Sequence, residues 1–283
     1  MKLVFFILAL TWLGMPLYAA ERVVSAGAGI TELVLLLGGQ PQLVAVDSTS
    51  VVPDDAKGIA VLGYHRALSA EGLLAQQPDL LLGSEEMGPA TALKLIEDAG
   101  VPIQILPAAN SPQQLLDNLS TIAVLLGRDH RSASVQLQTQ LQRIANLRAE
   151  LQRPPVVIFA LLRGDRAPKL GGHNTAADRI ISLAGGVNGA EFDGYKIISE
   201  ETLLTIKPDL ILVSKPNMDG DHPEPLAQEV VAALMTSLPL LAFTPAGLNQ
   251  QVINLPPQAL LGGLGPSALN AAESLAQQLV VLP

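Results

Sequence analysis

The chain has 283 residues and a formal net charge of −9; 49% of the residues are hydrophobic, 15% are charged and none is cysteine. Without cysteine there is no disulfide scaffold, no thiolate-ligated metal centre and no cysteine nucleophile. The acidic balance argues against a nucleic-acid-binding surface, and the apolar fraction excludes a disordered chain. The length fits about two domains.

The first twenty residues are typical of a secretory signal peptide. Lys2 precedes an apolar run over 3–13, and the small residues Ala19 and Ala20 close the segment. The run is too short for a permanent membrane helix. We expect cleavage after Ala19 or Ala20 and release into the periplasm of a protein with no lipid anchor, because a lipoprotein anchor needs a cysteine.

Strand and helix patterns alternate along the rest of the chain, which is typical of parallel α/β sheets. The first half predicts strands at 22–25, 43–47, 79–82 and 101–106, and helices at 31–37, 69–76 and 89–99. Ser111 and Pro112 begin a further helix, and a polar, glutamine-rich helix is predicted over 129–152. The second half predicts strands at 156–162 and 209–213, and helices at 175–184, 225–235 and 267–279.

One segment of the first half recurs in the second. Residues 69–82 align without gaps on 199–212, with identical residues at eight of fourteen positions, and a Gly-Tyr pair (Gly63-Tyr64, Gly194-Tyr195) precedes each copy. Such a repeat indicates two homologous units. We therefore predict an α/β fold of two similar lobes, each with a mainly parallel sheet flanked by helices, joined by a long rigid helix. The expected divisions are 1–20 signal peptide, 21–128 N-terminal lobe, 129–153 interlobe helix and 154–283 C-terminal lobe.

Ligands of open α/β sheets settle at the carboxyl ends of the strands and at domain interfaces. The loops expected there are 27–29, 48–50, 63–66, 84–88, 163–173, 192–196 and 215–222. The richest in chemistry contains Tyr64 and Arg66. A phenolate can bind Fe(III), and an arginine nearby can hydrogen-bond the phenolate or pair with a ligand carboxylate. From the residues alone, Tyr64 is either such an iron ligand or an ordinary loop tyrosine with a solvated hydroxyl.

Two residues of the second half are further candidates. His173 lies in a glycine-containing loop before a helix capped by Asn174 or Thr175, so it is either a second metal ligand or a solvated loop histidine. Tyr195 follows the repeated glycine and either reaches the cleft or packs inside its lobe. The four histidines lack the spacing of a bare zinc or manganese site.

Glu71 and Glu201 occupy equivalent positions in the repeat, each in the first turn of a predicted helix. They either stabilise the helix N-terminus or form a matched acidic pair that docks on a two-fold symmetric basic partner.

Enzyme and dinucleotide-binding motifs are lacking. Gly27-Ala28-Gly29 follows a strand, but Glu32 stands where a third glycine would be, and its carboxylate would repel a pyrophosphate. The sequence contains neither a phosphate-binding P-loop nor a Gly-x-Ser-x-Gly elbow.

Over the whole mature chain, the sequence resembles the periplasmic haem-binding proteins of bacterial ABC haem importers, within the class that also serves siderophores and cobalamin. The block Gly63-Tyr64-His65-Arg66 is the most specific, because it separates haem binders from their siderophore relatives. The other matching segments are 22–33, 175–178, 183–188, 194–196, 244–247 and 260–266.

The resemblance implies that Tyr64 is the axial ligand of haem iron and that Arg66 assists it. It implies that His173 is a candidate ligand for a second haem. It also implies that Glu71 and Glu201 dock on a dimeric inner-membrane ABC permease, and that an outer-membrane haem receptor acts before this protein. Ser267 departs from the basic residue often found after the final Gly-Pro, so no propionate contact is carried over there. We expect a monomeric, non-enzymatic haem carrier. The alternatives are a binding protein for a ferric siderophore or cobalamin, and a periplasmic α/β enzyme.

Overall fold

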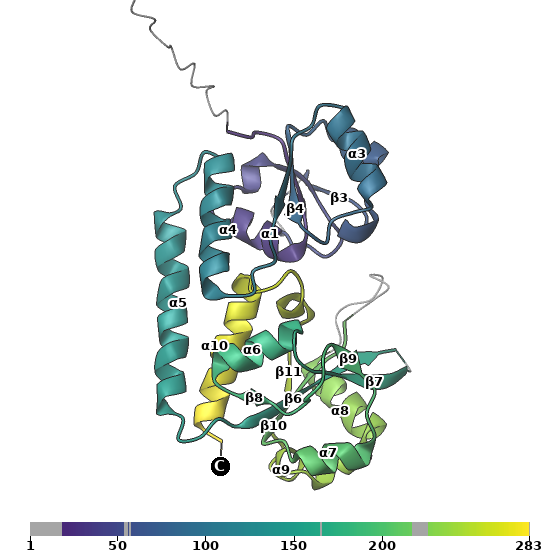
Figure 1. Cartoon of the computed structure of the whole chain (residues 1–283), viewed down its shortest axis with the longest axis vertical. Coiled ribbons are helices and arrows are strands. Elements are labelled where there is room, and N and C mark those ends of the chain that lie inside the picture. Colours follow the sequence, from purple (N-terminus) through teal and green to yellow (C-terminus); the bar gives the residue numbers. More distant parts are fainter. Residues whose placement is uncertain (1–18, 54–55, 57, 165, 217–225, 283) are drawn as a thin grey trace, which may run out of the picture.

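The computed structural model describes residues 19–53, 56, 58–164, 166–216 and 226–282. These residues form two α/β lobes stacked along the long axis of the molecule, with helix α5 (Arg131–Glu150) running beside them (Figure 1). Within these ranges, no helix is both long and apolar enough to span a bilayer. Most of the predicted signal peptide, residues 1–18, lies outside the described part, as does Pro225 at the start of one predicted helix.

The sheet of the N-terminal lobe is entirely parallel, in the order β3 (Ala60–Val61), β2 (Leu43–Val46), β1 (Val23–Ala26), β4 (Leu80–Ser84) and β5 (Ile103–Leu106). Successive side chains of a strand point to opposite faces. Val23 and Leu82 therefore pack with helices α1 (Ala28–Leu36) and α4 (Pro112–Leu125), whereas Val24 and Leu81 pack with α2 (Ala70–Leu74) and α3 (Ala90–Asp98). Both faces are covered, as a parallel sheet requires.

The sheet of the C-terminal lobe is mixed. Its order is β11 (Val252–Asn254), β10 (Leu210–Ser214), β6 (Val156–Arg163), β7 (Arg166–Gly171) and β9 (Tyr195–Lys196), and β8 (Val187–Asn188) also pairs with β6. The pairs of β6 with β7 and of β7 with β9 are antiparallel, and the others are parallel. The helices of this lobe are α6 (Ala176–Ala184), α7 (Glu200–Ile206), α8 (Ala227–Ser237), α9 (Pro245–Leu248) and α10 (Pro266–Val280).

The expectation that 163–173 forms a loop is wrong. The chain turns at Gly164, whose φ of 55° favours glycine, and returns as β7 along β6. The sequence of β7 hid the strand because Pro168 and the charged Arg166 and Lys169 break an alternating pattern. Likewise, β9 occupies the end of the expected loop 192–196. The predicted helix at 31–37 begins earlier, at Ala28.

The repeated segment folds in the same way in both lobes. Ser69 and Ser199 are the N-caps of α2 and α7, and each side chain accepts a hydrogen bond from the backbone N–H three residues on. After each helix, an aspartate accepts a backbone N–H beside the neighbouring strand: Asp79 from Arg22, and Asp209 from Val156. β4 and β10 then pair in parallel with β1 and β6. The two-lobed α/β architecture with mainly parallel sheets is thus confirmed, while the division at 128/129 and 153/154 stays a prediction.

The lobes also meet away from α5. The segment before α10 returns to the N-terminal lobe, where Leu264 donates its N–H to the Ala109 carbonyl at 2.8 Å and Ser267 donates its N–H to the Glu32 carboxylate at 2.9 Å. One cluster of buried apolar side chains runs through both lobes, from Leu33 through Ile144 to Phe159. The lobes therefore share part of a hydrophobic core.

Candidate ligand-binding site

Four loops meet at one edge of the N-terminal sheet. They follow the carboxyl ends of β1, β2, β3 and β4, which run in parallel and end on the same side. This edge is the place where open α/β sheets bind ligands. Tyr64 and Arg66 lie in the loop after β3, and Asp47 and Glu86 lie in the loops after β2 and β4.

Tyr64 has extended backbone geometry and precedes a short 3-10 turn, His65–Ala67. Its side chain is 43% exposed, and its ring lies against the ring of His65, with 4.4 Å between the centroids. The phenol can therefore meet both solvent and a ligand.

Arg66 lies close to Tyr64 and is held by a carboxylate. Its Nη2 is 2.5 Å from Oε1 of Glu86, and both side chains remain about half exposed. The hydrogen bond that Arg66 donates to Glu86 raises the pKa of Arg66, burial opposes this, and the charges of Glu86 and Tyr64 raise it further. The structure thus brings together the two residues that the sequence singled out in this loop. It adds Glu86 from the expected loop 84–88, a residue that no sequence pattern singled out.

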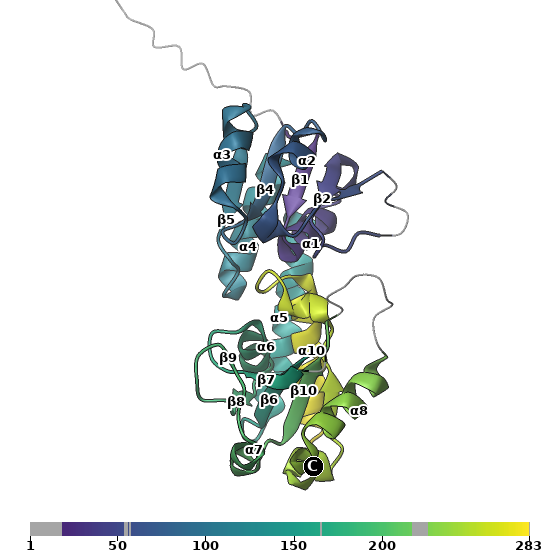
Figure 2. The ribbon, with the colours of Figure 1, turned by 90° about the vertical axis from the view of Figure 1, so that its right-hand side faces the viewer.

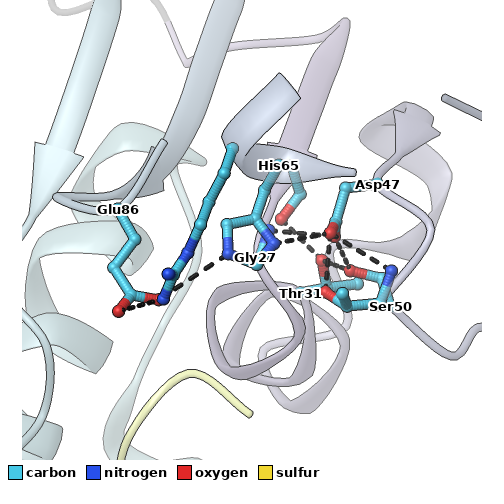
Figure 3. A network of polar contacts seen from close by, with 9 residues as sticks. Gly27, Thr31, Asp47, Ser50, His65 and Glu86 are labelled. Atoms are coloured by element: carbon cyan, nitrogen blue, oxygen red, sulfur yellow. Dashed lines mark hydrogen bonds and ion pairs between the residues drawn. The ribbon is translucent and has the colours of Figure 1, made fainter. Parts of the chain in front are cut away.

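His65 and Asp47 form the buried floor beneath this pair. His65 is 5% exposed and Asp47 is 1% exposed, and Nδ1 of His65 is 3.0 Å from Oδ2 of Asp47. Figure 3 shows His65 between Asp47 and Glu86, with Ser50 and Thr31 continuing the network on the far side of Asp47. The only sequence signal for this network was a polar run directly after a strand, Asp47-Ser48-Thr49-Ser50.

Tyr195 and His173 lie together in the C-terminal lobe. Gly194 donates its N–H to the His173 carbonyl, and the Tyr195 ring meets Phe159 edge-on, with centroids 6.4 Å apart. Burial raises the pKa of Tyr195, while the positive charges of Arg163 and Arg179 act in the opposite direction. His173 is half exposed, with Nδ1 3.6 Å from Asp178. Among the described residues, no polar or ring contact joins this group to Tyr64 or Arg66.

A cavity of about 580 Å³ lies where the lobes meet near α10. Its polar lining includes Glu32 from the N-terminal lobe and Asn254, Gln258 and Ser274 from the C-terminal lobe. The Oδ1 atom of Asn254 is buried without a hydrogen-bond partner. Burial raises the pKa of Glu32, although hydrogen bonds from Ser267 partly counter this. Neither candidate tyrosine lines this cavity.

Glu71 and Glu201 are both exposed, in the first turns of α2 and α7. These helices belong to different lobes and lie far apart along the molecule (Figure 2). A hydrogen bond from the backbone of Glu201 and another from the Ser199 side chain lower the pKa of the Glu201 carboxyl. Both glutamates are therefore accessible from the solvent.

Residues 23–259 match the model of a family described as periplasmic binding protein. The chain belongs to this family. The two-lobed α/β architecture agrees with this assignment.

Two solved periplasmic binding proteins are close in structure. A periplasmic haem-binding protein of Pseudomonas aeruginosa is 35% identical with a TM-score of 0.80, and 92% of this chain and 93% of that chain are covered. The periplasmic haem-binding protein HutB of Vibrio cholerae is 37% identical with a TM-score of 0.79, over 92% of this chain and 98% of that one.

Another relative has a different named ligand. The vitamin B12-binding protein of Yersinia pestis (strain Pestoides F) is 27% identical over 98% of this chain and 92% of its own length. The proteins similar to this chain thus include some named for binding haem and one named for binding vitamin B12.

Proposed function

We propose that this protein binds haem between its lobes and delivers it to an inner-membrane ABC permease, as a carrier without enzymatic activity. The observation that carries this proposal is the exposed phenol of Tyr64 beside Arg66, at the carboxyl edge of a parallel sheet. The similarity to two haem-binding proteins, each at least 35% identical, supports the same ligand.

The chemistry of this pair fits ferric haem. A phenolate is a hard anionic ligand that binds Fe(III) and favours it over Fe(II). The guanidinium of Arg66, two residues on, can donate a hydrogen bond to the phenolate oxygen or pair with a carboxylate of the ligand. We therefore expect the bound haem to be held in the oxidised state.

The C-terminal lobe supplies complementary groups. Arg163 and Arg179 lie near Tyr195, and Nε of Arg179 is buried without a hydrogen-bond partner. Guanidinium groups pair well with carboxylates, and haem carries two propionates. We propose that Tyr195 contacts the ligand here and that His173 is the candidate ligand for a second haem.

The test is a titration of the mature protein with hemin, followed by visible absorbance. Tyr64→Phe removes only the phenolic oxygen, so we expect loss of the phenolate–Fe(III) band and hemin binding weaker by roughly 100-fold, about 3 kcal/mol. Tyr195→Phe makes the same change at the other tyrosine of the mature chain and should keep the band. Unchanged binding and spectrum in Tyr64→Phe would refute the proposal.

Cobalamin is the second candidate ligand, because the relative from Yersinia pestis is named for it. Cobalamin and ferric siderophores bring their own metal coordination, so Tyr64 would be dispensable for either. Parallel titrations with cobalamin and with a ferric siderophore separate these cases: tighter binding of either than of hemin, unaffected by Tyr64→Phe, would favour the alternative.

The route of the protein follows from the same proposal. Residues 1–20 act as a cleavable signal peptide, and the monomeric carrier works in the periplasm, where it takes up haem that has entered through an outer-membrane receptor. Glu71 and Glu201, one on each lobe, dock on basic residues of the dimeric permease.

A further inference from the structure

We propose that Asp47 and His65 are positioning residues that hold Tyr64, and through Glu86 also Arg66, in place for the ligand. This inference rests on the proposed role of Tyr64 as the iron ligand. It concerns two buried side chains that do not themselves reach the ligand.

Asp47 is the anchor of the loops at this edge. Its Oδ1 accepts hydrogen bonds from the Gly27 N–H at 2.9 Å and the Ser50 hydroxyl at 2.6 Å, and its Oδ2 accepts from the Thr49 hydroxyl at 2.6 Å. These donors come from the turn after β1 and the loop after β2. Asp47 therefore fixes the loops of two neighbouring strands to each other.

His65 connects this anchor to the tyrosine. Because an ionised carboxylate can only accept a hydrogen bond, the Nδ1–H of His65 donates the hydrogen bond and Oδ2 of Asp47 accepts it. The imidazole is thereby fixed in orientation. Its ring contacts the Tyr64 ring at a tilt of 57°, so it forms the wall against which the phenol rests.

Burial along this turn points to the same role. Tyr64 and Arg66 have side chains that are about half exposed, whereas His65 between them is almost completely buried. The inward-pointing histidine holds the turn on the lobe, and its two neighbours point outward.

Glu86 extends the arrangement to Arg66. One oxygen of Glu86 lies 3.7 Å from Nε2 of His65, and the other pairs with the Arg66 guanidinium. The backbone of the same loop is tied down as well, because Gly88 donates its N–H to the His65 carbonyl at 2.9 Å. His65 therefore orients Tyr64 through direct ring contact, and it orients Arg66 through Glu86.

The test compares three variants of the buried pair. Asp47→Asn weakens the acceptor, His65→Asn keeps a donor near the position of Nδ1 but removes the ring, and His65→Phe keeps a ring but removes the donor. Since loss of groups that orient a metal ligand costs roughly 10- to 100-fold in affinity, we expect hemin to dissociate roughly 10- to 100-fold faster from each. The phenolate–Fe(III) band should shift in position, and in the ligand-free protein the backbone amides of 62–68 should exchange faster with deuterium.

Asp209→Asn is the matched control. Asp209 also accepts a backbone N–H beside a strand, in the other lobe, so its loss should lower stability without moving the band or the hemin dissociation rate. If Asp47→Asn does not fold, the band and the hemin dissociation rate of the two His65 variants test the inference.

The inference is overturned if Tyr64→Phe abolishes the band while the variants at 47 and 65 leave the band and the dissociation rate unchanged. That result would leave the proposed function intact. Retention of the band by Tyr64→Phe itself would instead remove the proposed function.

Discussion

Asp47 accepts five hydrogen bonds although its carboxylate is almost completely removed from solvent. Burial by itself raises the pKa of a carboxyl group, because it disfavours the charged form. Here the hydrogen bonds from His65, Ser50, Thr49 and Gly27 outweigh burial and lower the pKa of Asp47 to about 2. The folded protein therefore stabilises the ionised form of Asp47.

This lowered pKa makes a pH-dependent contribution to stability. The unfolded chain, with the ordinary pKa of 3.8, takes up a proton before the folded protein does. The contribution of Asp47 to the free energy of unfolding is therefore complete above about pH 4 and is lost as the pH falls through 2. It amounts to about 2 kcal/mol, because each pKa unit corresponds to about 1.4 kcal/mol. We expect the free energy of unfolding, measured with urea between pH 6 and pH 2, to fall more steeply for the native protein than for Asp47→Asn. Parallel curves for the two proteins would contradict the role of this carboxylate.

At the scale of elements, α1 and the segment before α10 approach so closely that only glycine fits. A Cβ added to Gly29, inside α1, would lie 2.7 Å from the Gly262 carbonyl oxygen. Gly262 itself has a φ of 78°, in the left-handed region that favours glycine. This junction joins the two lobes, since Gly262 lies in the C-terminal segment.

Gly29→Ala tests which effect dominates at this junction. Helix propensity alone favours alanine over glycine by about 1 kcal/mol. The clash with backbone should outweigh this and destabilise the protein by about 1–3 kcal/mol, as overpacking does. Gly72→Ala in α2 is the control, because its added Cβ meets nothing closer than 3.7 Å and should leave stability unchanged or raise it. The measurement is the free energy of unfolding of both variants, from chemical denaturation. A stabilised Gly29→Ala would show that the segment around Gly262 can move to accommodate the added methyl group.

At the scale of the whole molecule, the shared core and the junction at Gly29 limit how far the lobes can open. Apolar side chains from α5, α10 and both sheets pack in one cluster, and Glu32 on α1 accepts the Ser267 N–H at the start of α10. Wide separation of the lobes would expose this cluster to water. We therefore expect ligand transfer to be triggered by docking on the permease rather than by a large hinge motion.

Docking is tested by removing both proposed contacts. Glu71→Ala combined with Glu201→Ala should abolish hemin-dependent growth of bacteria that depend on this importer, because each lobe loses its carboxylate. Hemin binding in solution should be unchanged, because both side chains are exposed and lie in helices α2 and α7, outside the loop that carries Tyr64 and Arg66. Asp129→Ala with Glu150→Ala removes the same charge near the ends of α5 and should allow growth. Normal growth of the double glutamate variant would exclude the docking role.

The sequence alone was sufficient for the features that depend on local pattern. Apolar periodicity and the repeat of 69–82 at 199–212 predicted the two lobes. The serine caps of α2 and α7, found in the structure, are equally local, because each serine accepts a hydrogen bond from the backbone N–H three residues on. Tyr64 and Arg66 could be recognised as candidates from the sequence because both residues lie in one short loop.

Only the tertiary structure revealed the contacts between distant segments. His65 meets Asp47 across 18 residues because β2 and β3 are neighbours in register, and Ser267 meets Glu32 across 235 residues because the chain returns to the first lobe. Strand β7 could not be predicted from the sequence either, because it lacks an alternating pattern and is stabilised by its pairing with β6. Strand order and register decide which side chains become partners, and these are properties of the whole fold rather than of any short stretch of sequence.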